Sequence, residues 1–181
     1  MKNLTLASLT ATAILSASFP AYSMEERMTD ASIRKYYDDL PAVFKKPYDD
    51  FIKDYSSRAS DNLEINSTTT LRMPGQPPSQ STSTLTKEQL ISGAGDAYAA
   101  AKKARLWNEV TKITIAPDGK TATVEEVSRI SGINVQSEDP EHPFHADSTE
   151  ICTDQLVLTP GIGVQTAKSD CTVTVTITRK L

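Results

Sequence analysis

The chain has two cysteines, Cys152 and Cys171, on either side of a glycine-rich turn sequence at residues 159–163. Residues before and after the turn alternate between apolar and polar, which is typical of the two strands of a β-hairpin. If the turn is centred just after Gly161, paired residues have numbers that add up to 323, and the two cysteines face each other. Opposed residues in an antiparallel pair have Cα atoms about 4.5 to 5.5 Å apart, a distance that a disulfide can span. The sequence therefore predicts a disulfide between the strands of a C-terminal hairpin.

This register also predicts which face of the hairpin is buried. The cysteine face carries the apolar residues of both strands, Leu156, Leu158, Val173, Val175 and Ile177. The opposite face of the last strand carries four threonines, Thr172, Thr174, Thr176 and Thr178. We expect the disulfide to point into the core and the threonine face to lie on the outer surface of a sheet.

Residues 1–23 have the features of a signal peptide. Lys2 supplies a positive charge, residues 4–15 are mildly apolar, and Ala21 and Ser23 are the small residues expected before a cleavage site. The apolar stretch is too short and too rich in threonine to span a membrane, and no cysteine directly follows it to carry a lipid. We therefore expect a mature single domain, residues 24–181, that is periplasmic or secreted and has no stable membrane insertion after cleavage. Disulfides persist in such compartments.

The charge of the chain excludes one class of partner. The formal net charge is −4, and loss of Lys2 with the signal peptide makes it −5. A mildly acidic domain without a stripe of lysine and arginine lacks the electrostatic surface that nucleic acids require. We expect no nucleic-acid partner.

Hydrophobic spacing predicts two helices at the start of the mature chain. Apolar residues recur at helical spacing over residues 30–40 and again over residues 48–55. Thr29 or Asp30 is the expected cap of the first helix. Each helix has one apolar stripe and should pack on a neighbouring element.

A strand, a polar segment and a third helix follow. The strand is expected over residues 62–73, and the serine- and threonine-rich segment that ends at Thr84 is expected as a loop or a short edge strand. Thr86 and Gln89 form a capping box, which predicts a helix that runs to about Ala104.

A second hairpin is predicted around the turn sequence of residues 117–120. A four-residue loop pairs residues whose numbers add up to 237, so that Lys112 faces Glu125 as an attractive cross-strand pair. Glu126 then lies on the other, apolar face, opposite Thr111. A bulge at the turn would shift the register by one residue and exchange the two faces.

Helices that precede an antiparallel sheet define an α+β domain. The order of elements resembles the NTF2-like superfamily, the curved-sheet cone of SnoaL-like and ketosteroid-isomerase-like proteins. The residues that carry the resemblance are the capping-box helix from Thr86, Leu106 and Trp107 at the entry to the sheet, residues 111–124, and the closing hairpin. The resemblance implies a strongly curved antiparallel sheet wrapped around the N-terminal helices, with a pocket inside the cone. A cystatin-type fold, with a helix on a sheet, is the alternative.

Glu126 is the candidate catalytic residue. The resemblance implies that an acid inside the cone can serve as a general base, as in isomerases and dehydratases of the family. Tyr98 or Tyr37 could donate a proton beside it. The alternative is a carboxylate near the end of the sheet that is paired or solvated.

The polar connection at residues 131–147 contains both histidines of the chain, His142 and His145, together with several acids. Two histidines three residues apart with carboxylates nearby are a weak candidate for a Zn²⁺ site. Prolines in a polar loop do not fix such ligands in place. We therefore expect a solvated loop over the mouth of the cone, and no metal or other cofactor.

Fold alone does not decide the function, because the family includes isomerases, cyclases, dehydratases, carriers and scaffold subunits of secretion machinery. The sequence lacks a phosphate-binding glycine loop, a nucleophile elbow and a CxxC motif. We therefore expect an exported domain that binds a small apolar molecule or a protein partner in or around its cone, without catalysis. A cone enzyme that uses Glu126 is the first alternative. The second is a scaffold subunit of an envelope assembly, with the outer sheet face as the surface for a homodimer.

Overall fold

The computed structural model describes residues 27–135 and 144–179. The expected signal peptide lies outside these residues. The helices are α1 (Asp30–Asp38), α2 (Leu40–Val43), α3 (Tyr48–Ser57), α4 (Lys87–Ser92) and α5 (Ala94–Ala101). The strands are β1 (Ala59–Arg72), β2 (Ser79–Thr86), β3 (Arg105–Ile115), β4 (Thr121–Val135), β5 (Phe144–Thr159) and β6 (Gly163–Arg179).

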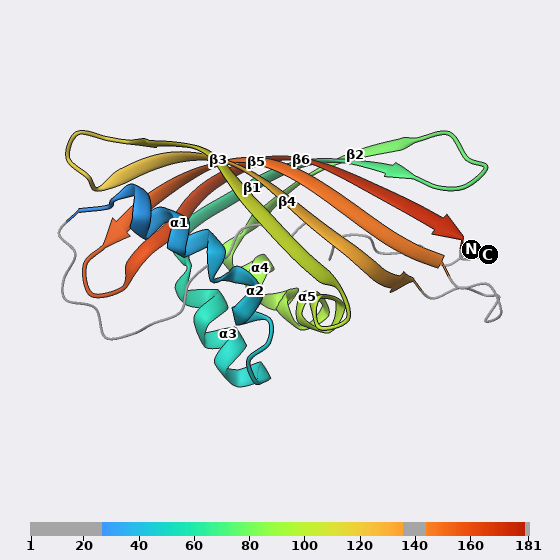
Figure 1. The fold of residues 1–181 in the computed structure, drawn as a ribbon, viewed down its shortest axis with the longest axis horizontal. Coiled ribbons are helices and arrows are strands. Elements are labelled where there is room, and N and C mark those ends of the chain that lie inside the picture. Colours follow the sequence, from blue (N-terminus) through green and yellow to red (C-terminus); the bar gives the residue numbers. More distant parts are fainter. Residues whose placement is uncertain (1–26, 136–143, 180–181) are drawn as a thin grey trace.

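The strands form one open sheet in the order β2-β1-β6-β5-β4-β3, and the helices lie on one side of it (Figure 1). The predicted α+β class is confirmed. Every neighbouring pair of strands is antiparallel except β1 and β6, which run parallel, so the sheet is mixed. The parallel pair consists of the first and last of the described strands, which are neighbours in the sheet.

The cap signals in the sequence correctly predict where helices begin. Thr29 and Ser32 form a capping box at α1, and Thr86 and Gln89 form one at α4. The single helix predicted to reach about Ala104 is wrong, because the chain breaks at Gly93 into α4 and α5. Glycine has low helix propensity, and Gly93 is the last cap of one helix and the first cap of the next.

The predicted register of the C-terminal hairpin is confirmed at the cysteines. Cys152 pairs with Cys171, their Cα atoms are 4.2 Å apart, and a disulfide joins them. The turn itself is one residue tighter than predicted, with Thr159 opposite Gly163. A register shift between Gln155 and Leu156 compensates for the tighter turn. The two differences cancel, so the faces are as expected from Gln155 to the far end of the hairpin.

The β3–β4 hairpin follows its predicted register only near the turn. Lys112 faces Glu125, and Lys112 Nζ lies 2.8 Å from the carboxylate of Glu125. A register shift between Val110 and Lys112 leaves Thr111 unpaired in the ladder. Glu126 is therefore opposite Val110, and the expected pairing with Thr111 is wrong. The shift lies in β3, so Glu126 keeps its inward orientation.

The long connection predicted over residues 131–147 is largely strand. β4 continues to Val135 and β5 begins at Phe144, so only residues 136–143 separate them, and these lie outside the described residues. A register shift between Ile130 and Ile133 contains Gly132, whose φ of +80° suits glycine.

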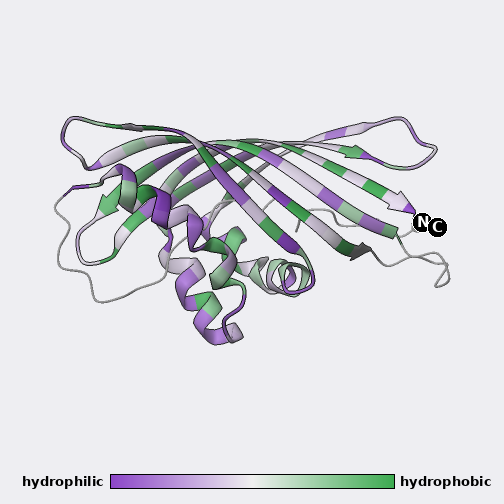
Figure 2. Cartoon of the chain, in the orientation of Figure 1, coloured by the Kyte–Doolittle hydropathy of each residue, from purple (hydrophilic) through white to green (hydrophobic). Residues whose placement is uncertain are grey.

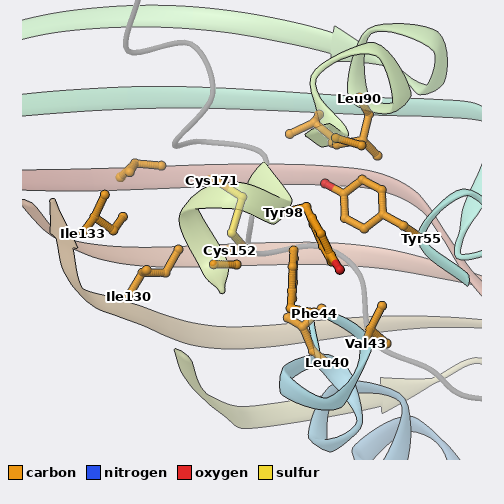
Figure 3. Packing of buried hydrophobic residues seen from close by; sticks show 14 of the residues in the cluster. Leu40, Val43, Phe44, Tyr55, Leu90, Tyr98, Ile130, Ile133, Cys152 and Cys171 are labelled. Carbon is orange, nitrogen blue, oxygen red and sulfur yellow. A yellow bond between two sulfur atoms is a disulfide. The ribbon is translucent and has the colours of Figure 1, made fainter. Parts of the chain in front are cut away.

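The core lies between the helices and the inner face of the sheet. Hydrophilic and hydrophobic residues alternate along much of the sheet, so that the apolar residues of the central strands share one face (Figure 2). Four aromatic residues of the helices pack together there, with ring centroids 4.8 to 5.2 Å apart in the closest pairs: Phe44, Phe51, Tyr55 and Tyr98. The disulfide faces this aromatic group (Figure 3), and Cys152 and Cys171 are buried in the core, as predicted.

A search for membrane-spanning helices over the described residues finds none of sufficient length and apolarity.

Candidate functional site

Three acids lie on the inner face of the sheet, where apolar residues would be expected. They are Glu126 of β4 and Glu150 and Asp154 of β5, and their exposed fractions are 1%, 0% and 0%. Glu126 is directly opposite Cys152. Glu150 and Asp154 are two residues before and after Cys152, so strand alternation turns both toward the same face as the disulfide. We call these three residues the acid cluster.

Asp154 is the member of the acid cluster with the most hydrogen bonds to its carboxylate. Tyr37 Oη of α1 donates a hydrogen bond to Asp154 Oδ2 at 2.6 Å, and Ser169 Oγ of β6 donates to Asp154 Oδ1 at 2.5 Å. Burial raises the pKa of Asp154 to about 6. The two hydrogen bonds oppose this rise, because they favour the charged form of the carboxylate.

Only one of the two carboxyl oxygens of Glu126 is hydrogen-bonded. Ser128 Oγ donates to Glu126 Oε2 at 2.7 Å, whereas Glu126 Oε1 has no hydrogen-bond partner in the structure. Burial raises the pKa of Glu126 well above its ordinary value, and the nearby charge of Asp154 raises it further.

Glu150 is the least satisfied of the three acids. Both of its carboxyl oxygens are buried without a hydrogen-bond partner, and so is the hydroxyl of Ser148 two residues away. Burial, followed by the charge of Asp154, raises the pKa of Glu150 to about 8. Burial also raises the pKa of Tyr55 in α3, and the charge of Glu150 adds to that rise.

The members of the acid cluster differ in how readily they ionise. The pKa of Asp154 is raised to about 6 and that of Glu150 to about 8, so Asp154 is the stronger acid of the two. Neighbouring acids whose environments separate their pKa values can act as proton donor and proton acceptor. The arrangement can thus donate hydrogen bonds, accept them and move a proton.

The sequence predictions place some of these groups correctly. Glu126 is on the inner face, and Tyr37 reaches the acid cluster through Asp154. Tyr98 belongs elsewhere, because its hydroxyl donates to the backbone oxygen of Lys46 at 2.7 Å and its ring packs among the core aromatics. The catalytic role of Glu126 remains a prediction.

The candidate metal loop has no support in the part of the chain that the structure describes. His145 is a half-buried residue of β5 whose Nε2 has no hydrogen-bond partner, and His142 lies outside the described residues. Among the described residues, no group of three or more histidines, cysteines and acids is arranged to hold a metal ion.

Two members of the acid cluster, Glu150 and Asp154, were not predicted from the sequence. Strand alternation places Glu150 and Asp154 on the same face of β5 as Cys152. They were not predicted to be buried, because the buried face of the hairpin was assigned from its apolar residues alone. The contact between Tyr37 and Asp154 spans 117 residues of the chain and has no local signal.

Arg58 is a second buried charge that the sequence did not indicate. It caps the end of α3, is 1% exposed, and none of its guanidinium nitrogens has a hydrogen-bond partner in the structure. Its guanidinium carbon lies 5.4 Å from the centroid of the Tyr36 ring. Burial lowers the pKa of Arg58 to about 9, against the opposing effect of Tyr36 and of nearby aspartates.

Side chains cover the acid cluster. Two hollows of the described surface, of about 530 and 380 Å³, lie beside α3 and on the outer surface of β2, β1 and β6. No member of the acid cluster lines either hollow. Tyr37 of α1 and Tyr55 of α3 are fully buried beside the acids, so access requires movement of these helices.

Comparisons with known proteins identify the fold. No family model matches the chain, and no curated protein matches its sequence. Among solved structures, a hexachlorocyclohexane dehydrochlorinase, LinA type 2, has a TM-score of 0.51 at 10% identity, covering 83% of this chain and 88% of its own. An NTF2-like protein from Cytophaga hutchinsonii has a TM-score of 0.46 at 17% identity, covering 80% of this chain and 98% of its own. A domain of unknown function with a cystatin-like fold, from Nostoc punctiforme, has a TM-score of 0.39 at 15% identity, covering 85% and 80%.

An open sheet with helices on one side and three buried acids on its inner face defines this molecule as an α+β protein. Its fold is similar to that of the dehydrochlorinase, and structures described as NTF2-like and ketosteroid isomerase-like are also among the matches, in agreement with the predicted resemblance. At these identities the likeness concerns the fold alone.

Proposed function

We propose that the protein is an exported NTF2-like binding protein whose interior holds a small molecule against the acid cluster. The observation that carries the proposal is the set of three buried carboxyl oxygens, one on Glu126 and two on Glu150, that have no hydrogen-bond partner. A buried polar group without a partner costs about 1 to 3 kcal/mol. A bound hydroxyl, amide or amine would supply the missing donors.

The surroundings of the acid cluster favour an amphiphilic ligand. The core aromatics Phe51, Tyr55 and Tyr98 offer an apolar surface in the same interior, and Tyr55 interacts electrostatically with Glu150. The polar end of the ligand would meet the acids and its apolar body would replace contacts among these rings. Export is supported by the leader-like sequence of residues 1–23 and by the disulfide.

Binding of small amphiphiles that end in an amine, an alcohol or an amide tests the proposal. We expect Glu126→Gln and Glu150→Gln to weaken binding about tenfold. The amide nitrogen that replaces one carboxyl oxygen cannot accept a hydrogen bond from the ligand, and a buried polar group left without a partner costs about 1 to 3 kcal/mol. Glu125→Gln is the matched control, because Glu125 is the neighbouring residue on the outer face and its side chain is 48% exposed. Equal binding by all three variants, measured by calorimetry, would contradict a site at the acid cluster.

A second candidate function is acid–base catalysis at the same place, of the isomerase, cyclase or dehydratase type. It is favoured by the separation of the pKa values of Asp154, about 6, and Glu150, about 8. Asp154 would accept a proton and a neutral glutamate would donate one. Turnover of a bound amphiphile with a bell-shaped pH dependence would support catalysis. If every ligand is recovered chemically unchanged, the result supports binding without catalysis.

A further inference from the structure

Among the described strands, β2 is an edge of the sheet that lacks the charges and irregular pairing that usually protect an edge. Among the described strands it pairs only with β1, through eight consecutive residue pairs without a register shift, from Glu64 with Thr86 to Leu71 with Ser79. Its sequence, Ser-Gln-Ser-Thr-Ser-Thr-Leu-Thr, contains no charged residue and no proline. Seven of its eight residues are exposed, and Leu85 is half-buried.

The opposite edge, β3, shows how this fold protects a strand. It carries three charged residues, Arg105, Glu109 and Lys112, and its ladder is interrupted before Lys112. Helix α1 also covers it, because Arg34 Nη1 donates to the backbone oxygen of Val110 at 3.3 Å. Charges, irregular pairing and a covering element are the means by which proteins keep sheet edges from pairing with other chains. β3 has all three, whereas β2 is long, regular and uncharged.

β2 is also held in a fixed position for pairing. Ser83 Oγ and Ser67 Oγ form a hydrogen bond of 2.8 Å, and Thr84 Oγ1 donates to Asn66 Oδ1 at 2.8 Å. Leu85 packs against the main core cluster. These contacts tie β2 to β1, so little conformational entropy remains to be lost when the free edge binds another strand.

We propose that the free edge of β2 binds β2 of a second copy of this chain, antiparallel about a two-fold axis, to make one continuous sheet. A two-fold axis brings a strand against itself, so any charge on the strand would meet a like charge close by. The absence of charge on β2 removes this repulsion and favours self-pairing.

Full pairing of the eight residues places Thr82 opposite Ser83 of the partner, and Ser81 opposite Thr84. These are pairs of hydroxyl side chains, which can hydrogen-bond across strands. Backbone hydrogen bonds provide the affinity, as in other cases of strand addition.

The mass of the purified protein in solution, measured by light scattering across a wide range of concentration, tests the proposal. We expect a dimer that dissociates on dilution. We expect Thr82→Lys to be a monomer, because it places two lysines beside the two-fold axis. Ile151→Lys should remain a dimer, because Ile151 lies on the outer face of β5, away from β2, and is 58% exposed.

A monomeric wild-type protein at every concentration would overturn the proposal. So would a dimer that Thr82→Lys leaves intact or that Ile151→Lys abolishes, since either places the contact on the outer sheet face. Circular dichroism establishes that both variants are folded. Hydrogen exchange gives an independent readout, because amides of residues 79–86 should exchange more slowly in the dimer, and equal exchange at all concentrations argues against edge pairing.

Discussion

The interior of this protein contains charged groups that most cores exclude. An unpaired buried acid usually stays neutral, because desolvation penalises the charged form. Burial raises the pKa of Glu126 and of Glu150 in this way, whereas hydrogen bonds from Tyr37 and Ser169 favour the charged form of Asp154. The local supply of hydrogen-bond donors therefore distinguishes Asp154 from the two glutamates.

Replacement of Glu150 tests this balance. The pKa of Glu150 is about 8 in the folded protein and 4.5 ordinarily, so its contribution to stability is complete below about pH 4.5 and is lost as the pH rises to about 8. Glu150→Gln cannot ionise, so its stability should match that of the wild type near pH 4 and exceed it increasingly up to pH 8. At about 1.36 kcal/mol per pKa unit, the difference reaches at most about 5 kcal/mol.

Urea unfolding of both proteins at a series of pH values measures this difference. Glu125→Gln serves as the control, because Glu125 is exposed and should show no such growth with pH. A constant offset between Glu150→Gln and the wild type across the whole range would show that Glu150 ionises normally.

The elements differ in how far the sequence determines them. Turn and cap residues predicted the starts of α1 and α4 and the two hairpins, because these signals act over a few residues. The register shifts in β3 and at Gln155 had no such signal, since they depend on how neighbouring strands fit the twisted sheet. Glu126 was nevertheless predicted on the correct face, because the register shift lies in β3 and not in its own strand, β4.

Gly93 gives an element-scale prediction. It is the position where the expected single helix divides into α4 and α5, and it has helical φ and ψ angles of −84° and −4°. A Cβ at Gly93 would lie 3.6 Å from the nearest atom, the backbone oxygen of Gln89, which is an ordinary contact. Gly93→Ala should therefore stabilise the protein by about 0.5 to 1 kcal/mol.

Gly95 provides the comparison for that substitution. A Cβ there would lie 3.4 Å from the hydroxyl of Tyr48, so Gly95→Ala should gain less than Gly93→Ala. Thermal unfolding of the two variants distinguishes them. A loss of stability in Gly93→Ala would mean that the break between α4 and α5 is required by packing rather than by the low helix propensity of glycine.

For the whole molecule, helical spacing and strand alternation predicted the α+β class and the inward disulfide, whereas the resemblance to the NTF2-like superfamily rested on the order of the elements. Of the three acids in the acid cluster, only Glu126 was predicted to face inward. Glu150 and Asp154 were not, because the inner face of the last hairpin was assigned from its apolar residues alone. Their partners come from distant parts of the chain: Tyr37 from α1 and Ser169 from β6. Such contacts form only when the helices pack on the sheet, so no local sequence pattern predicts them.

The disulfide ties the strands at the middle of this sheet, and its removal tests how much of the molecule's stability depends on it. Cys152 and Cys171 are 19 residues apart, and closing a loop of this size is worth about 3 kcal/mol in the chain-entropy model. The reductant-treated protein should therefore unfold at a lower denaturant concentration by about that free energy. Cys152→Ser/Cys171→Ser should be destabilised at least as much, because hydroxyls replace buried sulfurs, and its unfolding should not respond to reductant. An equal stability of the oxidised and reduced wild-type protein would show that packing of β5 against β6 holds the hairpin together without the covalent bond.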